Sequence, residues 1–272
     1  MKKMFLTAVL MAMGSAGLHA ELIQNGTLET WGALTNIPPQ GAPTSWTVNG
    51  TAPTQVPGLL AGSTYAALLP ANSGIGTSEL TQTIPILDRV NQFDFSFVVA
   101  AADPGSTSAR SFHLQMLTQT GPGTFPVPIA MIMTRGSSAG VLSLKAYNGS
   151  AWLDVAANAF NASVYNPGDN EFSTLNAYQI TVSADFGSET PSYDVSYGLV
   201  GGSMTTVSNV NIFFQTPSEV NGRDLAILKF NGSASLGNYA LDDISVIPEP
   251  GSIGLLAVGL FALRAIRRRR KG

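Results

Sequence analysis

The segment Phe93-Asp94-Phe95-Ser96-Phe97 carries the strongest structural signal in this chain. Three aromatic side chains alternate with two polar ones. Because successive side chains of a strand point to opposite faces, this pattern predicts a strand with one buried face. The same alternation returns at 112–116, 178–182 and 193–197. Repeated half-buried strands of this kind are typical of antiparallel sheets.

Turn signals separate these strands. Asn148-Gly149 lies between the apolar runs 141–147 and 151–153, which is a hairpin signature. Asp103-Pro104-Gly105 and Asn166-Pro167-Gly168 are further breaks, and no long apolar repeat with the helical period is present. The sequence therefore predicts an all-β protein, an antiparallel β-sandwich of the jelly-roll kind. We assign residues 21–247 to one such ectodomain, with 21–90 as its first strands and long loops.

The N-terminus has the features of a secretory signal peptide. Lys2 and Lys3 precede an apolar stretch from Met4 to Met13, and small residues follow up to Ala20. We expect cleavage after Ala20, with Ala16 as the alternative position. Residues 1–20 are therefore assigned to export, the alternative being a buried core helix.

Residues 248–272 fall into three consecutive parts. Pro248-Glu249-Pro250 ends the strand pattern, since proline lacks the N–H that a sheet requires. Residues 251–266 are mostly apolar, and as a helix they would rise only about 24 Å, short of a ~30 Å hydrocarbon core. A basic cluster follows, made of Arg267, Arg268, Arg269, Arg270 and Lys271. We expect a short transmembrane helix, suited to transient anchoring, with the basic cluster in the cytoplasm.

This order of parts resembles the PEP-CTERM sorting signal of Gram-negative bacteria. The resemblance implies that an exosortase-type transpeptidase in the inner membrane reads Pro248, Glu249 and Pro250. The enzyme would remove the tail and pass the protein to the cell envelope or the extracellular matrix. The alternative is an ordinary tail anchor in which Pro-Glu-Pro occurs by chance.

Charge is distributed unevenly along the chain. The formal net charge is −3, but eight of the 14 basic residues lie in the first three and last nine positions. Residues 21–247 hold six basic and sixteen acidic residues, a net charge of −10. Since nucleic-acid binding relies on a basic surface, nucleic acid is not expected as a partner. The chain has no cysteine, which excludes thiol catalysis and thiolate metal sites.

Two short segments resemble strands of carbohydrate-binding jelly rolls. Gln24-Asn25-Gly26-Thr27-Leu28-Glu29 is similar to the opening strand of galactose-binding-like domains, and Leu241–Val246 is similar to their closing strand. The central part of the chain, including Trp152, is closer to concanavalin A-like (laminin G-type) sandwiches. Both architectures are jelly rolls. The length of the ectodomain favours the concanavalin A-like one, with the galactose-binding-like one as the alternative.

The galactose-binding-like resemblance implies a structural calcium ion shared by the opening Glu and a closing Asp. Carried onto this chain, the ligands are Glu29 with Asp242 or Asp243. Oxygen ligands from an acidic exported domain suit calcium. The alternative is that these are solvated turn acids without a metal.

Sugar binding requires an exposed aromatic platform beside polar groups. The candidates are Trp31, Trp152 and Tyr165, while Trp46 is expected to pack in the core. Core packing is the alternative for each candidate.

The sequence offers little for catalysis. His113 is the one histidine left after signal cleavage, and its place in a strand is typical of an ordinary histidine. There is no Gly-x-Ser-x-Gly nucleophile motif and no strand with the paired acids of concanavalin A-like glycosidases. We therefore expect a non-catalytic envelope or matrix protein that binds or packs with polysaccharide. An extracellular glycan hydrolase and a purely structural surface protein are the alternatives.

Overall fold

A computed structural model describes residues 23–35, 40–70, 78–87, 92–106, 109–118, 129–148, 150–185, 192–211, 225–232 and 238–248. Every regular element in these ranges is a strand. The front sheet has the order β1 (Thr47–Gly50), β4 (Ser78–Leu87), β15 (Leu225–Gly232), β6 (Arg110–Thr118), β7 (Ile129–Arg135), β8 (Val141–Tyr147), β9 (Trp152–Asn161). The back sheet has the order β14 (Thr205–Asn211), β13 (Ser192–Leu199), β12 (Tyr178–Asp185), β5 (Gln92–Ala101), β16 (Tyr239–Pro248), β3 (Tyr65–Leu69), β2 (Thr54–Pro57).

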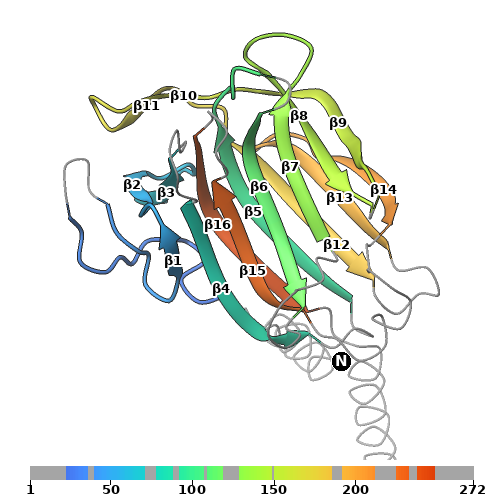
Figure 1. The fold of residues 1–272 in the computed structure, drawn as a ribbon, viewed down its shortest axis with the longest axis horizontal. Helices are drawn as coiled ribbons and strands as arrows, with labels where there is room; N and C mark the ends of the chain where they lie inside the picture. Colours follow the sequence, from blue (N-terminus) through green and yellow to red (C-terminus); the bar gives the residue numbers. More distant parts are fainter. Residues whose placement is uncertain are drawn as a thin grey trace, which may run out of the picture.

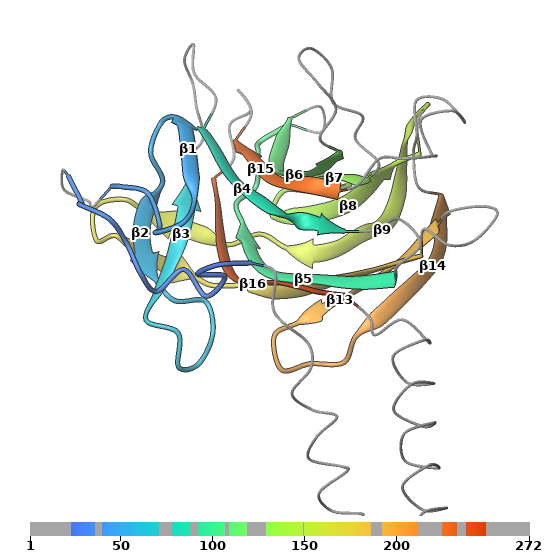
Figure 2. The ribbon, with the colours of Figure 1, turned by 90° about the horizontal axis from the view of Figure 1, so that it is seen from below.

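The two seven-stranded sheets stack face to face, as Figures 1 and 2 show. All strand pairs within the two sheets are antiparallel. A separate hairpin, β10 (Val164–Asn166) with β11 (Glu171–Thr174), lies outside both sheets. The predicted antiparallel β-sandwich is confirmed. In the described residues no helix has the length and apolar character needed to cross a membrane; the expected signal and tail helices lie outside them.

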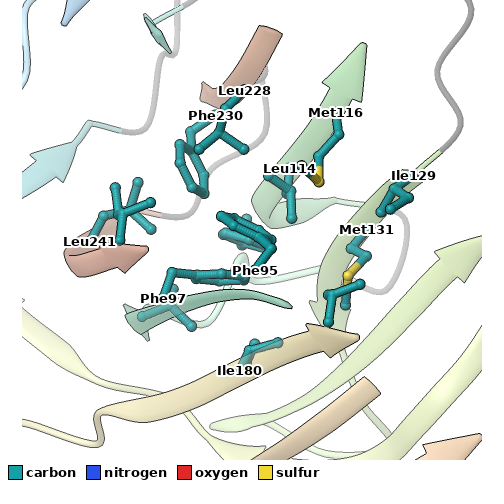
Figure 3. Close-up of a cluster of buried hydrophobic side chains, with 14 of the residues drawn as sticks. Phe95, Phe97, Leu114, Met116, Ile129, Met131, Ile180, Leu228, Phe230 and Leu241 are labelled. Atoms are coloured by element: carbon teal, nitrogen blue, oxygen red, sulfur yellow. The ribbon is translucent and has the colours of Figure 1, made fainter. Parts of the chain in front are cut away.

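The alternating Phe residues of β5 form the centre of the core. Phe95 and Phe97 stack on each other with ring centroids 5.2 Å apart. Phe97 also stacks on Phe112 of β6 at 5.4 Å and meets the edge of Phe230 of β15 at 5.8 Å. Figure 3 shows Phe95 and Phe97 of the back sheet facing Phe230 of the front sheet. Aromatic pairs at this spacing add about 0.5–1.5 kcal/mol each to the gain from burial.

A second, smaller apolar cluster covers the outer side of the back sheet. Its buried members are Val56, Leu59, Ala66, Leu68, Val98, Ala100, Ala177 and Ala240. The β2–β3 loop and the β10–β11 hairpin supply its cover, the hairpin through the partly buried rings of Tyr165 and Phe172. The outer side of the back sheet over β2, β3, β5 and the start of β16 is therefore covered by the chain itself.

Candidate functional site

The outer side of the front sheet carries a group of polar and aromatic side chains from neighbouring strands. Along β6 the inward residues Phe112, Leu114 and Met116 are at most 1% exposed, so their neighbours face outward. Strands β15, β7, β8 and β9 present the corresponding outward residues beside them. We call this set the Trp152 face. Its members are Arg110, His113, Gln115, Lys145, Tyr147, Trp152, Asp154, Lys229 and Asn231.

Trp152 contacts three other members of this face, Tyr147, His113 and Arg110. Its ring lies 5.2 Å from that of Tyr147, its partner across the β8–β9 ladder, and 6.2 Å edge-on from that of His113. The guanidinium carbon of Arg110 lies 5.3 Å from the centroid of the Trp152 ring. A cation over an indole face is held by the ring quadrupole. Trp152 therefore serves as a support for Arg110, a role beyond the open stacking platform expected from the sequence.

The Arg110 guanidinium has no carboxylate partner among the described residues. The lysines of the face differ in this respect, because each has an acid beside it. Lys229 Nζ lies 2.8 Å from Glu79 Oε1, and Lys145 Nζ lies 3.4 Å from Asp154 Oδ1. Arg110 is thus the positive charge of this face that is available for an external anion.

His113 is neutral at physiological pH. Burial lowers its pKa, and the positive charges of Arg110 and Lys229 lower it further, to about 4. In the neutral ring one nitrogen donates a hydrogen bond and the other accepts one. A neutral imidazole next to two cations can therefore bind a polar ligand without adding repulsion.

Several polar atoms on this side of the sheet are buried without a hydrogen-bond partner. Ser111 Oγ and Thr134 Oγ1 lie on paired strands near the β6 bulge, and both residues are under 7% exposed. Asn231 Oδ1 is also without a partner, although the amide nitrogen of Asn231 donates to Gln115 Oε1 at 3.1 Å. Buried polar groups are usually satisfied by protein, water or a ligand. All three atoms are enclosed by the protein, so a polysaccharide on the surface does not reach them.

The predicted calcium residues Glu29 and Asp242 meet at a different place, the β2–β3 loop. Glu29 Oε1 accepts from Ser63 Oγ at 2.9 Å and from the Thr64 N–H at 2.6 Å. Asp242 Oδ2 accepts from the Leu59 N–H at 2.9 Å. The Ser63 hydroxyl also lies 3.1 Å from the Tyr65 carbonyl oxygen.

Opposite pKa shifts follow from these surroundings. Burial is the largest influence on both carboxyl groups and acts to raise the pKa. In Glu29 the hydrogen bonds from Thr64, Ser63 and Tyr65 outweigh it, so its pKa is lowered. In Asp242, which is fully buried, desolvation prevails and the pKa is raised. Asp243 is exposed, at a φ of 46°, and stands outside this pair.

Glu29 and Asp242 both accept hydrogen bonds from the β2–β3 loop, and calcium at this pair stays a prediction. No group of three or more His, Asp or Glu side chains is placed to hold a metal in the described ranges. Calcium usually takes six to eight oxygen ligands. Backbone carbonyl groups and water would therefore have to complete a site here.

The other aromatic candidates have packing roles. Trp31 is partly buried against the main core, and its ring N–H donates to the Leu28 carbonyl at 2.6 Å. Tyr165 packs against Phe172 and donates its hydroxyl proton to Asn170 Oδ1 at 2.7 Å. Trp46 is 5% exposed and lies in the core, as expected. Of the three predicted platform residues, Trp152 lies on the outer side of the front sheet, and Trp31 and Tyr165 do not.

Sequence reasoning missed Arg110 and the role of His113. Both residues stand in one strand, three positions apart, and a bulge between Arg110 and Phe112 lets the arginine join the outward residues. Sequence alternation separates His113 from Phe112 and Leu114, but the alignment of β6 with β7, β8 and β9 was needed to bring Trp152 beside it.

Comparisons with known proteins support the sorting signal. Residues 246–270 match the family model of the PEP-CTERM protein-sorting motif. The motif indicates an exported precursor that passes through the membrane, and it implies processing by an exosortase, which is the partner that the sequence resemblance suggests. Among curated proteins none matches this sequence.

Solved structures share the architecture at low sequence identity. A carbohydrate esterase of the Shiga toxin-encoding bacteriophage phi24B is 12% identical, with a TM-score of 0.51, covering 81% of this chain and 97% of its own. A Lotus tetragonolobus seed lectin is 12% identical, with a TM-score of 0.44 and coverages of 76% and 95%. An alginate lyase from Aplysia kurodai is 9% identical, with a TM-score of 0.41 and coverages of 71% and 86%. At these identities the esterase shows a shared fold and nothing about activity.

Proposed function

We propose that this exported chain is a surface protein that binds an acidic polysaccharide on its Trp152 face. The observation that carries the proposal is Arg110, a cation supported by an indole ring and without an acidic partner among the described residues. A planar guanidinium pairs well with a carboxylate through two parallel hydrogen bonds. Uronic-acid units supply carboxylates at regular intervals along a polysaccharide.

The composition of the domain supports the same choice. Residues 21–247 carry a net charge of −10 and only six basic residues. Three of those six, Arg110, Lys145 and Lys229, lie on this one face. A positive face on an acidic domain favours an anionic ligand there and repels it elsewhere. The neutral His113 ring beside Arg110 adds a hydrogen-bonding group without adding charge.

Binding suits this face better than catalysis. A general base works best when its pKa lies near the working pH. The pKa of His113, about 4, makes the ring a weak base at neutral pH. Asp154 on the face and Glu79 beside it are each paired with a lysine. Both observations favour a non-catalytic role over the hydrolase alternative.

Affinity gel electrophoresis of the purified ectodomain tests the proposal. Alginate and polygalacturonate should retard the protein, and neutral dextran should not. Arg110→Gln should weaken binding roughly ten- to hundredfold, since a hydrogen bond to a charged group contributes about 1.5–3 kcal/mol. Retardation should also fall with added salt.

Arg135→Gln is the matched control. Arg135 is another basic residue of the front sheet, but it pairs with Asp103 at the β7–β8 end, at 3.5 Å. It should bind like the wild type. Equal binding by the Arg110→Gln variant, or binding to dextran alone, would rule out the acidic-glycan site. Shortening of the polysaccharide during incubation would instead favour an enzyme.

A further inference from the structure

The sorting motif begins inside the folded domain. The match to the motif starts at Val246, which is fully buried in the main core. Val246, Ile247 and Pro248 all belong to β16, and they pair with Phe95, Asp94 and Phe93 of β5. No spacer therefore separates the sandwich from the residues that the processing enzyme is expected to read.

The strand in question is an interior one. β16 lies between β5 and β3 in the back sheet, and its N-terminal half pairs with both. In its second half the Ile244 N–H donates to the Gly26 carbonyl at 2.8 Å, which ties the strand to the opening segment of the domain. The first residues of the motif, Val246 to Pro248, are thus already paired with β5.

A peptidase needs the main chain on both sides of the bond it cuts. The four residues from Ile247 to Pro250 span only about 13 Å when fully extended, at roughly 3.3 Å per residue. This reach is small compared with the depth of an enzyme cleft that must enclose several residues of substrate. The folded sandwich and the enzyme would compete for the same few residues.

We infer that the end of β16 must separate from β5 before the motif can be processed, so that the fold limits the rate of its own sorting. The inference rests on the proposed processing by an exosortase. Local opening at strand ends occurs more readily than global unfolding, because few buried contacts are lost. Ile247 is 38% exposed, which makes these terminal pairs the easiest part of β16 to open.

The same geometry restricts where the chain is cut. A cut before Pro248 would fall within the paired strand, next to core residue Val246. We therefore expect the mature protein to end at Pro248 or beyond. Intact mass measurement of the processed protein reads this end directly.

Pulse-chase labelling of the full-length chain in a producing bacterium tests the inference. A six-residue Gly-Ser linker inserted between Ile247 and Pro248 should make the precursor disappear several-fold faster. The same linker inserted after Gly201, an exposed turn residue between β13 and β14 with a φ of 75°, is the control and should leave the rate unchanged.

A second pair of variants separates strand opening from added reach. Ile247→Gly weakens the strand end without lengthening the chain and should also speed processing, whereas Ile247→Thr keeps a β-branched residue and should not. Normal processing at the same rate in the linker and Ile247→Gly variants would overturn the inference. Failure of the wild-type chain to be processed at all would instead overturn the proposed sorting.

Discussion

His113 shows how one buried side chain links stability to pH. Burial and the nearby charges of Arg110 and Lys229 lower its pKa from 6.5 to about 4. In the unfolded chain the ring regains its ordinary pKa, so the unfolded state binds more protons between pH 6.5 and pH 4. Stability contributed by the neutral ring is therefore present above pH 6.5 and is lost as the pH falls towards 4.

We predict that His113→Gln removes this part of the acid sensitivity. The shift to a pKa of about 4 corresponds to roughly 3 kcal/mol between the two ends of the window. Urea unfolding at pH 7 and pH 4.5 should show a smaller loss of stability in the variant than in the wild type. Parallel pH profiles for the two proteins would contradict the prediction.

Asp242 is predicted to stabilise the β2–β3 loop through its hydrogen bonds. Asp242→Ala leaves the N–H groups of Leu59 and Asp243 without their acceptor, and both are now held at 2.9 Å. The Leu59 donor is buried, and leaving it unsatisfied costs about 1–3 kcal/mol. Thermal unfolding should show a clear fall in Tm. Asp243→Asn is the control, since Asp243 is exposed and Asn tolerates its positive φ; an equal fall there would refute the assignment.

Calcium at Glu29 and Asp242 is a separate prediction. Because a ligand that binds only the folded state stabilises it, Tm should be higher in calcium than in chelator. Glu29→Gln keeps an oxygen that accepts from Thr64 but removes the charge, so the calcium-dependent rise should disappear in this variant. An identical Tm of the wild type in calcium and chelator would dismiss a bound ion.

Strands with strict alternation were predictable from sequence, and their order in the sheets was not. Phe93–Phe97 and Tyr178–Val182 were identified because each alternates against a hydrophobic core, and the two strands are indeed neighbours. β15 and β16 each insert between earlier strands of a sheet. Such long-range pairings depend on contacts between segments far apart in the chain, which local patterns do not report. The Trp152 face depends on this pairing, so it could not be assembled from sequence.

A bulge in β9 shapes the edge of the front sheet that this strand forms. β9 carries an insertion between its pairs Ala156–Leu144 and Phe160–Leu142, and Asn158 within it has a φ of 55°. Asn158 Oδ1 accepts from the Ser137 N–H at 2.6 Å, which docks the insertion on the β7–β8 turn. A bulge of this kind locally bends its strand and increases its twist.

We predict that Gly136→Ala disturbs this docking. A Cβ at Gly136 would collide with Asn158 Oδ1 and come within 3.2 Å of the Val141 carbonyl. Relief of the clash requires Asn158 to release the Ser137 N–H, and we expect a loss of about 1–3 kcal/mol. Chemical denaturation measures this loss in the free energy of unfolding. Gly140→Asn is the control: no atom would meet its Cβ, and Asn tolerates the φ of 75° better than most residues, so its loss should be smaller than that of Gly136→Ala.

In the molecule as a whole, the export signals and the domain are joined more closely than their separate functions require. β16 supplies Leu241, Ile244 and Val246 to the core, each at most 1% exposed. It also carries the first residue of the Pro-Glu-Pro box at its last pair, Pro248 with Phe93. The segment that completes the back sheet is therefore the segment that the processing enzyme must approach.

This arrangement predicts a sharp limit for truncation from the C-terminal side. A truncated chain that ends at Pro248 keeps every β16 pair. It should unfold as cooperatively as the protein processed in the cell. A chain ending at Leu241 loses Ile244 and Val246, whose burial contributes about 1.5–3 kcal/mol each, and the ladder with β5 that goes with them. This loss is comparable to the total stability of about 5–15 kcal/mol of a typical domain. Circular dichroism during heating distinguishes the two chains, and a cooperative transition at the same Tm in the shorter one would show that β16 is dispensable.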